Sequence, residues 1–185
     1  MPNTSATGGF LAGSAVRHRE ELENVFHDLI AGITGLPAKL VRPRYQPKGI
    51  KTPPPSANWC AFVVTAASTP GSGRAMRAVQ HQAEGDGHDE LLSDKPLDLL
   101  VSMYGPEAWE IMERLLDGLS IWQNRELLRR NGLGFVRHSP VTHVPEQESF
   151  GWLERWDCTL TFNRMTRRRY EVQNIVEAAP IIVTE

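Results

Sequence analysis

The chain has 185 residues, of which 41% are hydrophobic and 23% are charged, a balance typical of one soluble globular domain rather than a disordered chain. Its 20 basic and 22 acidic residues give a net charge of -2, which excludes a bulk attraction to nucleic acid or anionic lipid. Two cysteines exclude a disulfide framework and favour a reducing compartment, and no apolar run reaches the roughly 18 residues of a membrane span. The first residues also lack the pattern of a secretory signal.

The N-terminal third begins with small and polar residues, so we expect residues 1–13 to be a mobile tail and residues 14–185 to form one domain. Apolar residues then recur at helical spacing as far as Ile33, which predicts a helix with Ser14 at its N-cap and Gly35 just beyond its end. This is the clearest helical pattern in the chain.

Three segments of contrasting composition follow this helix. Repeated prolines in residues 36–57 predict an extended arm that lies over a surface. Residues 59–66 are rich in β-branched and aromatic side chains, which predicts an inner strand. Residues 67–90 are rich in Gly, Ser, Gln and acidic residues, so they predict a long polar loop.

The second half of the chain has a mixed order of strands and helices. Alternating residues in 152–164 predict a long half-buried strand that points Trp152, Trp156, Cys158, Leu160 and Phe162 inward, and a turn at 164–166 would return the chain through 169–176. The preceding predicted elements are a strand over 97–104, a helix from Gly105-Pro106 to Gly118, a short helix over 123–130 and a strand over 133–144 broken at Pro140. This order predicts an α+β fold, in which helices pack on one face of a mostly antiparallel sheet.

One segment carries side chains that could bind a metal, although their spacing matches no known motif. The imidazoles and carboxylates are His81, Glu84, Asp86, His88, Asp89 and Glu90. Because this spacing fits neither HExxH nor an EF-hand loop, we interpret the cluster as a solvated acidic loop. Cys60 and Cys158 fall on apolar faces, where a thiol behaves as a small hydrophobe. We therefore predict no catalytic residue, no cofactor and no bound metal.

Basic and aromatic residues point instead to contacts with other macromolecules. A run of arginines lies beside Tyr170: Arg164, Arg167, Arg168 and Arg169. We interpret it as a charged sheet edge that resists aggregation, with phosphate contact as the alternative. The arm carries a second basic set, Lys39, Arg42, Arg44, Lys48 and Lys51, which suits a segment lying on another subunit. Trp59, Trp109, Trp152 and Trp156 are predicted core residues. Trp122 is the tryptophan most suited to exposure as an interface anchor, with burial in the core as an equal alternative.

An ordered set of short elements resembles the phage neck terminator, or tail completion, proteins of tailed bacteriophages. The elements are RPRYQP (42–47), PPP followed by WCAF (53–62), YGP (104–106), DGLSIWQNRELL (117–128), VPE (144–146) and WDCTLTFNRMTRRRYEVQNI (156–175). The resemblance covers about residues 36–178.

This resemblance implies a structural virion protein, made in the host cytoplasm, that forms a hexameric ring at the head-proximal end of the tail tube. Its implied partners are further copies of itself, the tail tube protein and a head connector or stopper protein, with the sheath protein as a further candidate. Genomic DNA would pass through the lumen without sequence-specific binding, and no membrane is involved. Apart from the resemblance, exposed and unusual composition predicts a subunit or tube interface at Arg42, Arg44, Tyr45, Trp122, Gln123, Asn124 and Arg125, and a lumen or phosphate contact at Arg167, Arg168 and Arg169.

Three other functions stay open at the level of the sequence. A stopper or connector-ring protein is the alternative within the same structural class. A nucleic-acid-binding module would use the 164–170 arginine run, and its affinity would fall steeply with salt. A metal-dependent enzyme would use the histidines and carboxylates of residues 81–90.

Overall fold

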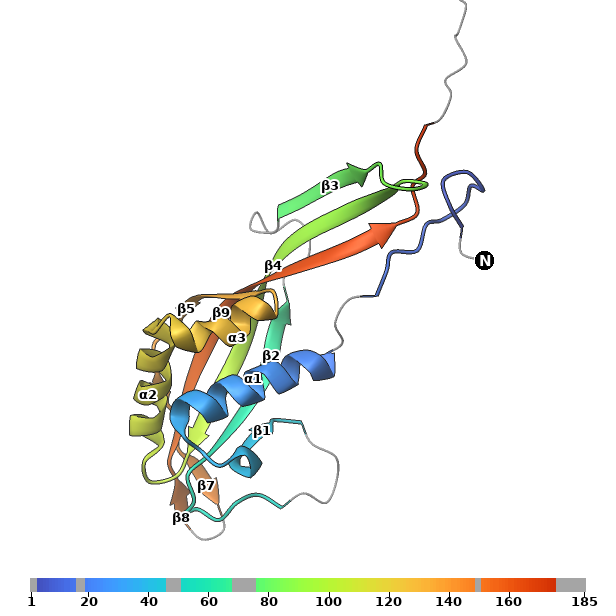
Figure 1. Ribbon diagram of the computed structural model, residues 1–185. Helices are drawn as coiled ribbons and strands as arrows, with labels where there is room; N and C mark the ends of the chain where they lie inside the picture. Colours follow the sequence, from blue (N-terminus) through green and yellow to red (C-terminus); the bar gives the residue numbers. More distant parts are fainter. Residues whose placement is uncertain (1–2, 16–18, 46–50, 68–75, 149–150, 176–185) are drawn as a thin grey trace, which may run out of the picture. The chain divides into compact units, whose positions relative to one another are not determined.

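The computed structural model describes residues 3–15, 19–45, 51–67, 76–148 and 151–175 (Figure 1). Its contacts divide the chain into two compact units. The large unit comprises Arg17–Ala75 and Asp94–Met165, and the small unit comprises Met1–Val16, Met76–Ser93 and Thr166–Glu185.

The helices and strands confirm the α+β class. The helices are α1 (Arg19–Thr34), α2 (Ala108–Ser120) and α3 (Glu126–Arg130), with short 3-10 turns η1 (Ala38–Leu40) and η2 (Gln123–Arg125). The strands are β1 (Val41–Pro43), β2 (Trp59–Ala67), β3 (Met76–Gln82), β4 (His88–Tyr104), β5 (Leu133–His138), β6 (Thr142–His143), β7 (Glu146–Glu148), β8 (Gly151–Leu153) and β9 (Arg155–Tyr170).

One seven-stranded sheet organises the molecule. Its main path is β1-β2-β4-β9-β5, to which β3 is added on β4 and β6 on β9, while β7 and β8 form a separate hairpin. The pairs β2–β4, β5–β9 and β6–β9 are antiparallel and β1–β2 is parallel, so the sheet is mostly antiparallel as predicted. Strands β1 and β5 therefore end the main path on opposite sides of the large unit.

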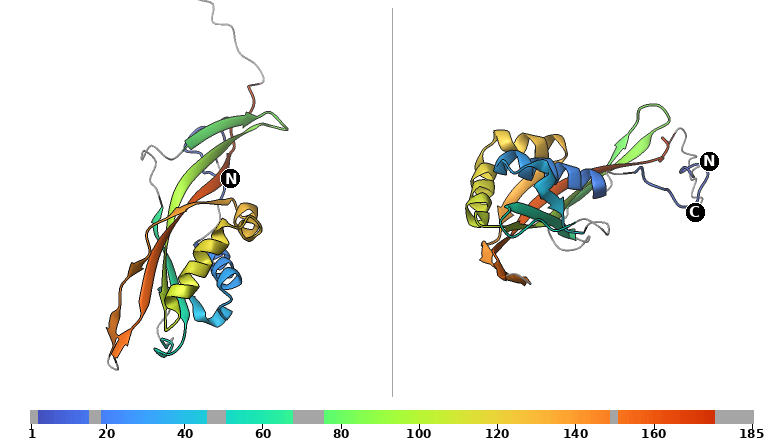
Figure 2. Two further views of the ribbon diagram at one scale, coloured as in Figure 1. Left: turned by 90° about the vertical axis from the view of Figure 1, so that its left-hand side faces the viewer. Right: turned by 90° about the horizontal axis from the view of Figure 1, so that it is seen from below.

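Helices α1, α2 and α3 cover one face of the sheet in the large unit (Figures 1 and 2), as the sequence predicts. The predicted helical stripe is confirmed, because Phe26 and Ile30 of α1 are fully buried. Phe26 packs on Phe162 of β9 with 5.1 Å between ring centroids, and Phe135 of β5 lies 5.7 Å from the same ring. These contacts place the hydrophobic core between the helices and the sheet.

Two sequence predictions about strands β3, β4 and β9 are wrong. Residues 76–82 of the predicted polar loop form β3, and β4 already begins at His88, because the backbone pairs without needing a buried apolar face. Residues 68–75 of that loop lie outside the described residues. The predicted turn at 164–166 is also absent, since β9 continues to Tyr170; no glycine, proline or asparagine there favours a turn.

Two predicted helix boundaries also need correction. The hydroxyl of Ser14 accepts a hydrogen bond from the Arg169 amide at 3.0 Å, so it pairs with the end of β9 instead of capping a helix. Helix α2 continues past Gly118 to Ser120. The absent side chain of Gly118 instead gives space to Ile33 of α1, which a Cβ at this position would overlap. Gly118 thus serves helix packing.

Residues 3–15 lie along the end of β9 within the small unit. The amides of Ser5 and Ser14 donate to the carbonyls of Glu171 at 3.0 Å and Arg169 at 2.9 Å. The mobility of residues 1–13 and the single domain over 14–185 stay predictions.

The turn between β4 and α2 depends on Gly105. Its φ is +108°, and a Cβ there would lie 2.5 Å from the carbonyl oxygen of Ala57. Its amide donates to the carbonyl of Glu154 at 3.1 Å. Only glycine combines this backbone conformation with such close approach. Among the described helices, none is both long and apolar enough to cross a membrane.

Candidate assembly surfaces

The basic residues of the proline-rich segment lie at the β1 edge of the sheet. The Arg42 guanidinium donates to the carbonyls of Lys39 at 2.7 Å and Lys51 at 3.0 Å, and thereby links these two positions of the segment. Arg44 approaches the Tyr104 hydroxyl at 3.4 Å, and Tyr45 is 75% exposed. Within the described ranges, no carboxylate pairs with Lys39, Arg42, Arg44 or Lys51, and we call these four residues the basic edge. Lys48 lies outside the described residues.

The second group of predicted interface residues lies on the other side of the large unit. Trp122 is 63% exposed, as predicted, and the guanidinium of Arg129 stands 4.6 Å from its ring centroid. Arg125 lies 5.8 Å from the same ring. A small depression beside Trp122 is lined by residues of β5, including Leu133 and Phe135. The structure therefore brings Trp122 and Arg125 to the β5 side, away from Arg42, Arg44 and Tyr45.

Gln123 and Asn124 of the same corner have different surroundings. Gln123 is exposed, whereas Asn124 is half-buried and its side-chain amide donates to the Gly118 carbonyl at 2.9 Å. Asn124 thus adds a second hydrogen bond to a carbonyl at the end of α2 that also accepts from the Ile121 amide at 3.1 Å. Asn124 therefore stabilises the corner from which Trp122 projects.

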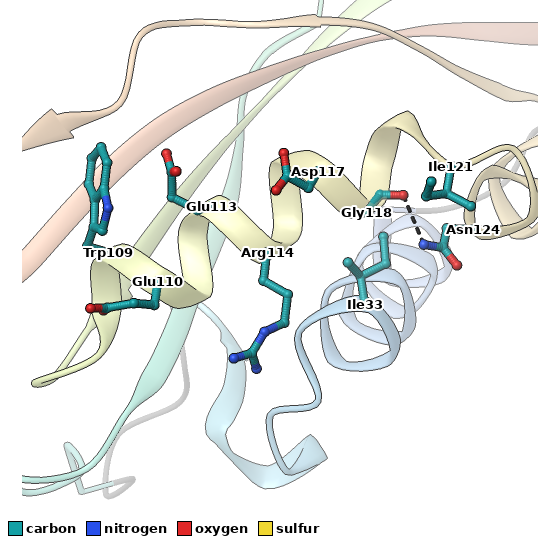
Figure 3. A pocket seen from close by; sticks show the side chains of 9 residues that line it. All are labelled: Ile33, Trp109, Glu110, Glu113, Arg114, Asp117, Gly118, Ile121 and Asn124. Atoms are coloured by element: carbon teal, nitrogen blue, oxygen red, sulfur yellow. Dashed lines mark hydrogen bonds between the residues drawn. The ribbon is translucent and has the colours of Figure 1, made fainter.

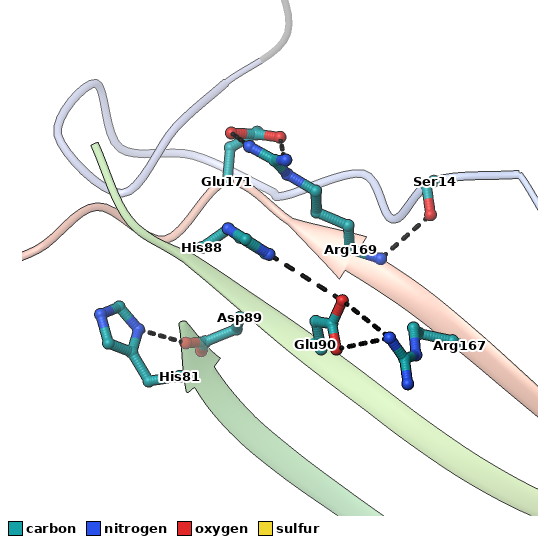
Figure 4. A network of polar contacts seen from close by, with 8 residues as sticks. All are labelled: Ser14, His81, His88, Asp89, Glu90, Arg167, Arg169 and Glu171. Atoms are coloured by element: carbon teal, nitrogen blue, oxygen red, sulfur yellow. Dashed lines mark hydrogen bonds and ion pairs between the residues drawn. The ribbon is translucent and has the colours of Figure 1, made fainter. Parts of the chain in front are cut away.

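The arginine run does not form one basic patch. In the small unit, Arg167 pairs with Glu90 at 3.3 Å, and Arg169 pairs with Glu171 at 2.9 Å (Figure 4). Arg168 donates to the Ser14 carbonyl at 3.0 Å. Because successive strand residues point to opposite faces and two of these cations have acidic partners, the local positive field is weak.

The predicted candidate metal ligands of residues 81–90 are also separated by the strand geometry. His81 on β3 lies 2.7 Å from Asp89 on β4, while His88 lies 3.9 Å from Glu90 (Figure 4). Asp89 points to the opposite face of β4 from His88 and Glu90. In the described part of the chain, no three histidine, cysteine or acidic side chains are grouped so that they could hold a metal ion.

His81 has a second partner that fixes its environment. The side-chain nitrogen of Asn174 donates to the carbonyls of Ala83 and Gly85, both at 3.1 Å, so its oxygen faces the His81 ring nitrogen at 2.9 Å. Hydrogen bonding to Asp89 and then to Asn174 raises the pKa of His81 above its ordinary value. The imidazole therefore serves as a structural bridge.

Both thiols are buried in the large unit, as predicted. Cys60 is fully buried, and desolvation raises its pKa. Cys158 is 1% exposed, and its pKa is raised by burial in the same way. Neither thiol has the exposed, electropositive surroundings of a reactive cysteine.

Two of the predicted core tryptophans are in fact on the surface. Trp152 is 69% exposed because it lies on β8 of the separate hairpin, not on β9. Trp109 is 40% exposed, and one side of its ring packs on Trp156 with 4.5 Å between centroids. Trp59 and Trp156 are half-buried against the core, as predicted.

Sequence reasoning missed a groove of about 540 Å³ along the outer side of α2 (Figure 3). Its acidic side chains, Glu110, Glu113 and Asp117, recur every three or four residues and so share one side of the helix. Ile33, Trp109 and Ile121 add apolar surface, and Arg114 is tied to the Thr34 carbonyl at 2.9 Å. We call this feature the acidic groove. The helical spacing of these three carboxylates is the sequence pattern that could have indicated an acidic side of α2.

Comparison with known families identifies the family of this chain. The family model described as phage neck terminator protein matches residues 20–185, which confirms the resemblance carried by the sequence elements. A comparison with curated proteins finds no match. The matched family is one of structural proteins of the phage neck. The chain belongs to the phage neck terminator protein family.

Proposed function

We propose that this protein forms a homohexameric ring that caps the head-proximal end of the tail tube and joins it to the head connector or stopper protein. The observation that carries this proposal is the placement of the predicted interface residues in two unlike groups, one at the β1 edge and one beside β5. A ring that closes by rotation uses two different patches on every subunit. Family membership supplies the tail-terminator role itself.

The proposed partners are the tail tube protein on one side of the ring and the connector or stopper on the other, with the sheath protein as a further candidate. Genomic DNA would pass through the lumen without sequence-specific contacts. The pairing of Arg167 and Arg169 with acidic residues supports such weak contact, because the charge of these two arginines is already balanced within the subunit. The protein would be made in the host cytoplasm and reside in the virion neck.

The molar mass in solution tests the ring directly. Light scattering is measured over a range of protein concentrations, first with the protein alone and then with purified tail tubes. We expect a ring of about six subunits, either free or formed on the tubes. A twelvefold ring would instead indicate a connector-type assembly, and a monomer indifferent to tubes would refute the proposed role.

A further inference from the structure

We propose that the acidic groove of one subunit receives the basic edge of the next subunit. This inference rests on the proposed ring and pairs its β1-edge group with the acidic groove, whose lining residue Asn124 belongs to the corner that carries Trp122. The occupant of the groove is therefore a second copy of this chain.

The acidic groove has charge without compensation inside its own subunit. Glu113 and Asp117 point out from α2, and Glu110 lies one turn earlier on the same helix (Figure 3). Within the described ranges, none of these three carboxylates has a basic partner. Arg114 is the one cation among the lining residues, and it is directed to the Thr34 carbonyl. The groove therefore favours a cationic occupant.

The groove also has apolar surface suited to a protein partner. Ile121 is 56% exposed and Trp109 is 40% exposed, and both line the groove. Aromatic side chains beside charged groups are typical of the centre of protein interfaces, where they exclude water from the polar contacts. A free metal ion or a small cation would leave this apolar surface exposed.

The basic edge offers the complementary chemistry. Lys39 and Lys51 are exposed, and their backbone carbonyls are held by Arg42. The backbone at both lysines is thus held in place, which lowers the entropy lost on binding. The exposed Tyr45 ring adjoins Arg44 and supplies an aromatic contact for the apolar part of the groove.

The two surfaces are separated within the large unit. Helix α1 contacts both α2 and β1, so it lies between the acidic groove and the edge of the sheet. Figure 1 shows α2 and β1 on opposite sides of α1. Because the charges of one subunit are kept apart in this way, they can be matched by neighbours in a head-to-tail contact.

A pair of charge-reversal variants tests the match. The first is Glu113→Lys with Asp117→Lys in the acidic groove, and the second is Lys39→Glu with Lys51→Glu in the basic edge. Arg42 is kept because it holds two backbone carbonyls. Each variant alone faces like charges in a head-to-tail contact and should lose at least about tenfold in association, whereas an equimolar mixture should restore the wild-type mass by alternating the two variants around an even-numbered ring.

The control is Glu84→Lys with Asp86→Lys, which makes the same change in net charge as the acidic-groove variant at exposed positions of the small unit. It should assemble like the wild type. Circular dichroism and thermal unfolding check that each variant is folded. Raising the salt from about 0.05 M to about 0.5 M should weaken the wild-type ring, since exposed charge pairs are screened.

The outcomes separate this inference from the proposed function. If both reversal variants assemble as the wild type does, the pairing of these two faces is overturned. The same holds if the mixed variants fail to assemble. In either case the proposed ring of the wild-type protein still stands. A wild-type protein that forms no ring, even with tail tubes, would overturn the proposed function and this inference together.

Discussion

The large unit and the small unit are each stabilised internally by different forces. Every buried apolar side chain in the described part of the chain, from Leu22 to Phe162, belongs to the large unit. The small unit relies on backbone pairing, on Asn174 and on exposed ion pairs, and its Val79 is 64% exposed. Since apolar burial is the dominant stabilising contribution to folding, we infer that the small unit opens locally at a lower free energy than the large unit.

The largest expected effect comes from removing a ring from the core of the large unit. Phe162→Ala should lower the free energy of unfolding by about 3–5 kcal/mol, because it leaves a cavity between α1 and β5. Urea denaturation followed by circular dichroism measures the loss. Val79→Ala in the small unit is the control and should change the free energy by less than about 0.5 kcal/mol. Equal losses in the two variants would refute the contrast between the units.

The next effect is confined to the small unit. Asn174→Ala removes two hydrogen bonds to the turn carbonyls of Ala83 and Gly85, and should destabilise that turn by about 1 kcal/mol. Amide hydrogen exchange should accelerate in residues 83–87 while global unfolding is unchanged. Gln173→Ala, at the neighbouring position, is the matched control. Faster exchange throughout the large unit would contradict the prediction.

A smaller effect depends on pH, through His81. Its ring nitrogens face two acceptors, the Asp89 carboxylate and the Asn174 oxygen, so the protonated ring makes both bonds and the neutral ring loses one. Because the folded-state pKa is raised, this contribution is fully present below about pH 6.5 and is lost as the pH rises through the raised value. NMR titration of His81 should show a pKa above 6.5.

His81→Gln provides the comparison for this titration. Its exchange in residues 83–87, corrected for the intrinsic pH dependence, should differ from that of the wild type at acidic pH and approach it at alkaline pH. A wild-type pKa at or below the ordinary value would contradict the bridge between Asp89 and Asn174.

The smallest effect is expected from the ion pair between the half-buried Glu90 and the exposed Arg167. Arg167 keeps 63% of its side chain exposed, so water and salt screen the pair. Glu90→Gln should therefore change the local stability of the β9 end by less than about 0.5 kcal/mol, as measured by hydrogen exchange. A loss above about 1.5 kcal/mol would show that the pair holds the small unit together.

The elements that could be predicted from the sequence have a local repeating pattern with one buried side. Phe26 and Ile30 mark the inward side of α1, and Leu160 and Phe162 mark that of β9. Strand β3 has no such pattern, because its described side chains are exposed or half-buried and backbone pairing alone defines it. Its residues therefore resembled a loop.

The candidate site could be predicted only where exposure follows from local sequence. Trp122 was placed correctly because polar and basic residues surround it at a helix corner. Trp152 was misplaced because the break between β8 and β9 at Glu154 changes which side faces the core. The acidic groove depends on the packing of α1 against α2, which brings Ile33 beside Gly118. No local sequence pattern predicts this packing.

The conformation of Gly105 limits how sequences of this fold can diverge. Charged surface positions accept many replacements, so motifs such as the arginine run identify relatives poorly. A side chain at position 105 would meet the backbone of residues 57 and 58 and would require an unfavourable φ. The tripeptide Tyr104-Gly105-Pro106 is therefore a physically constrained marker by which remote homologues can be aligned when the rest of their surface has changed.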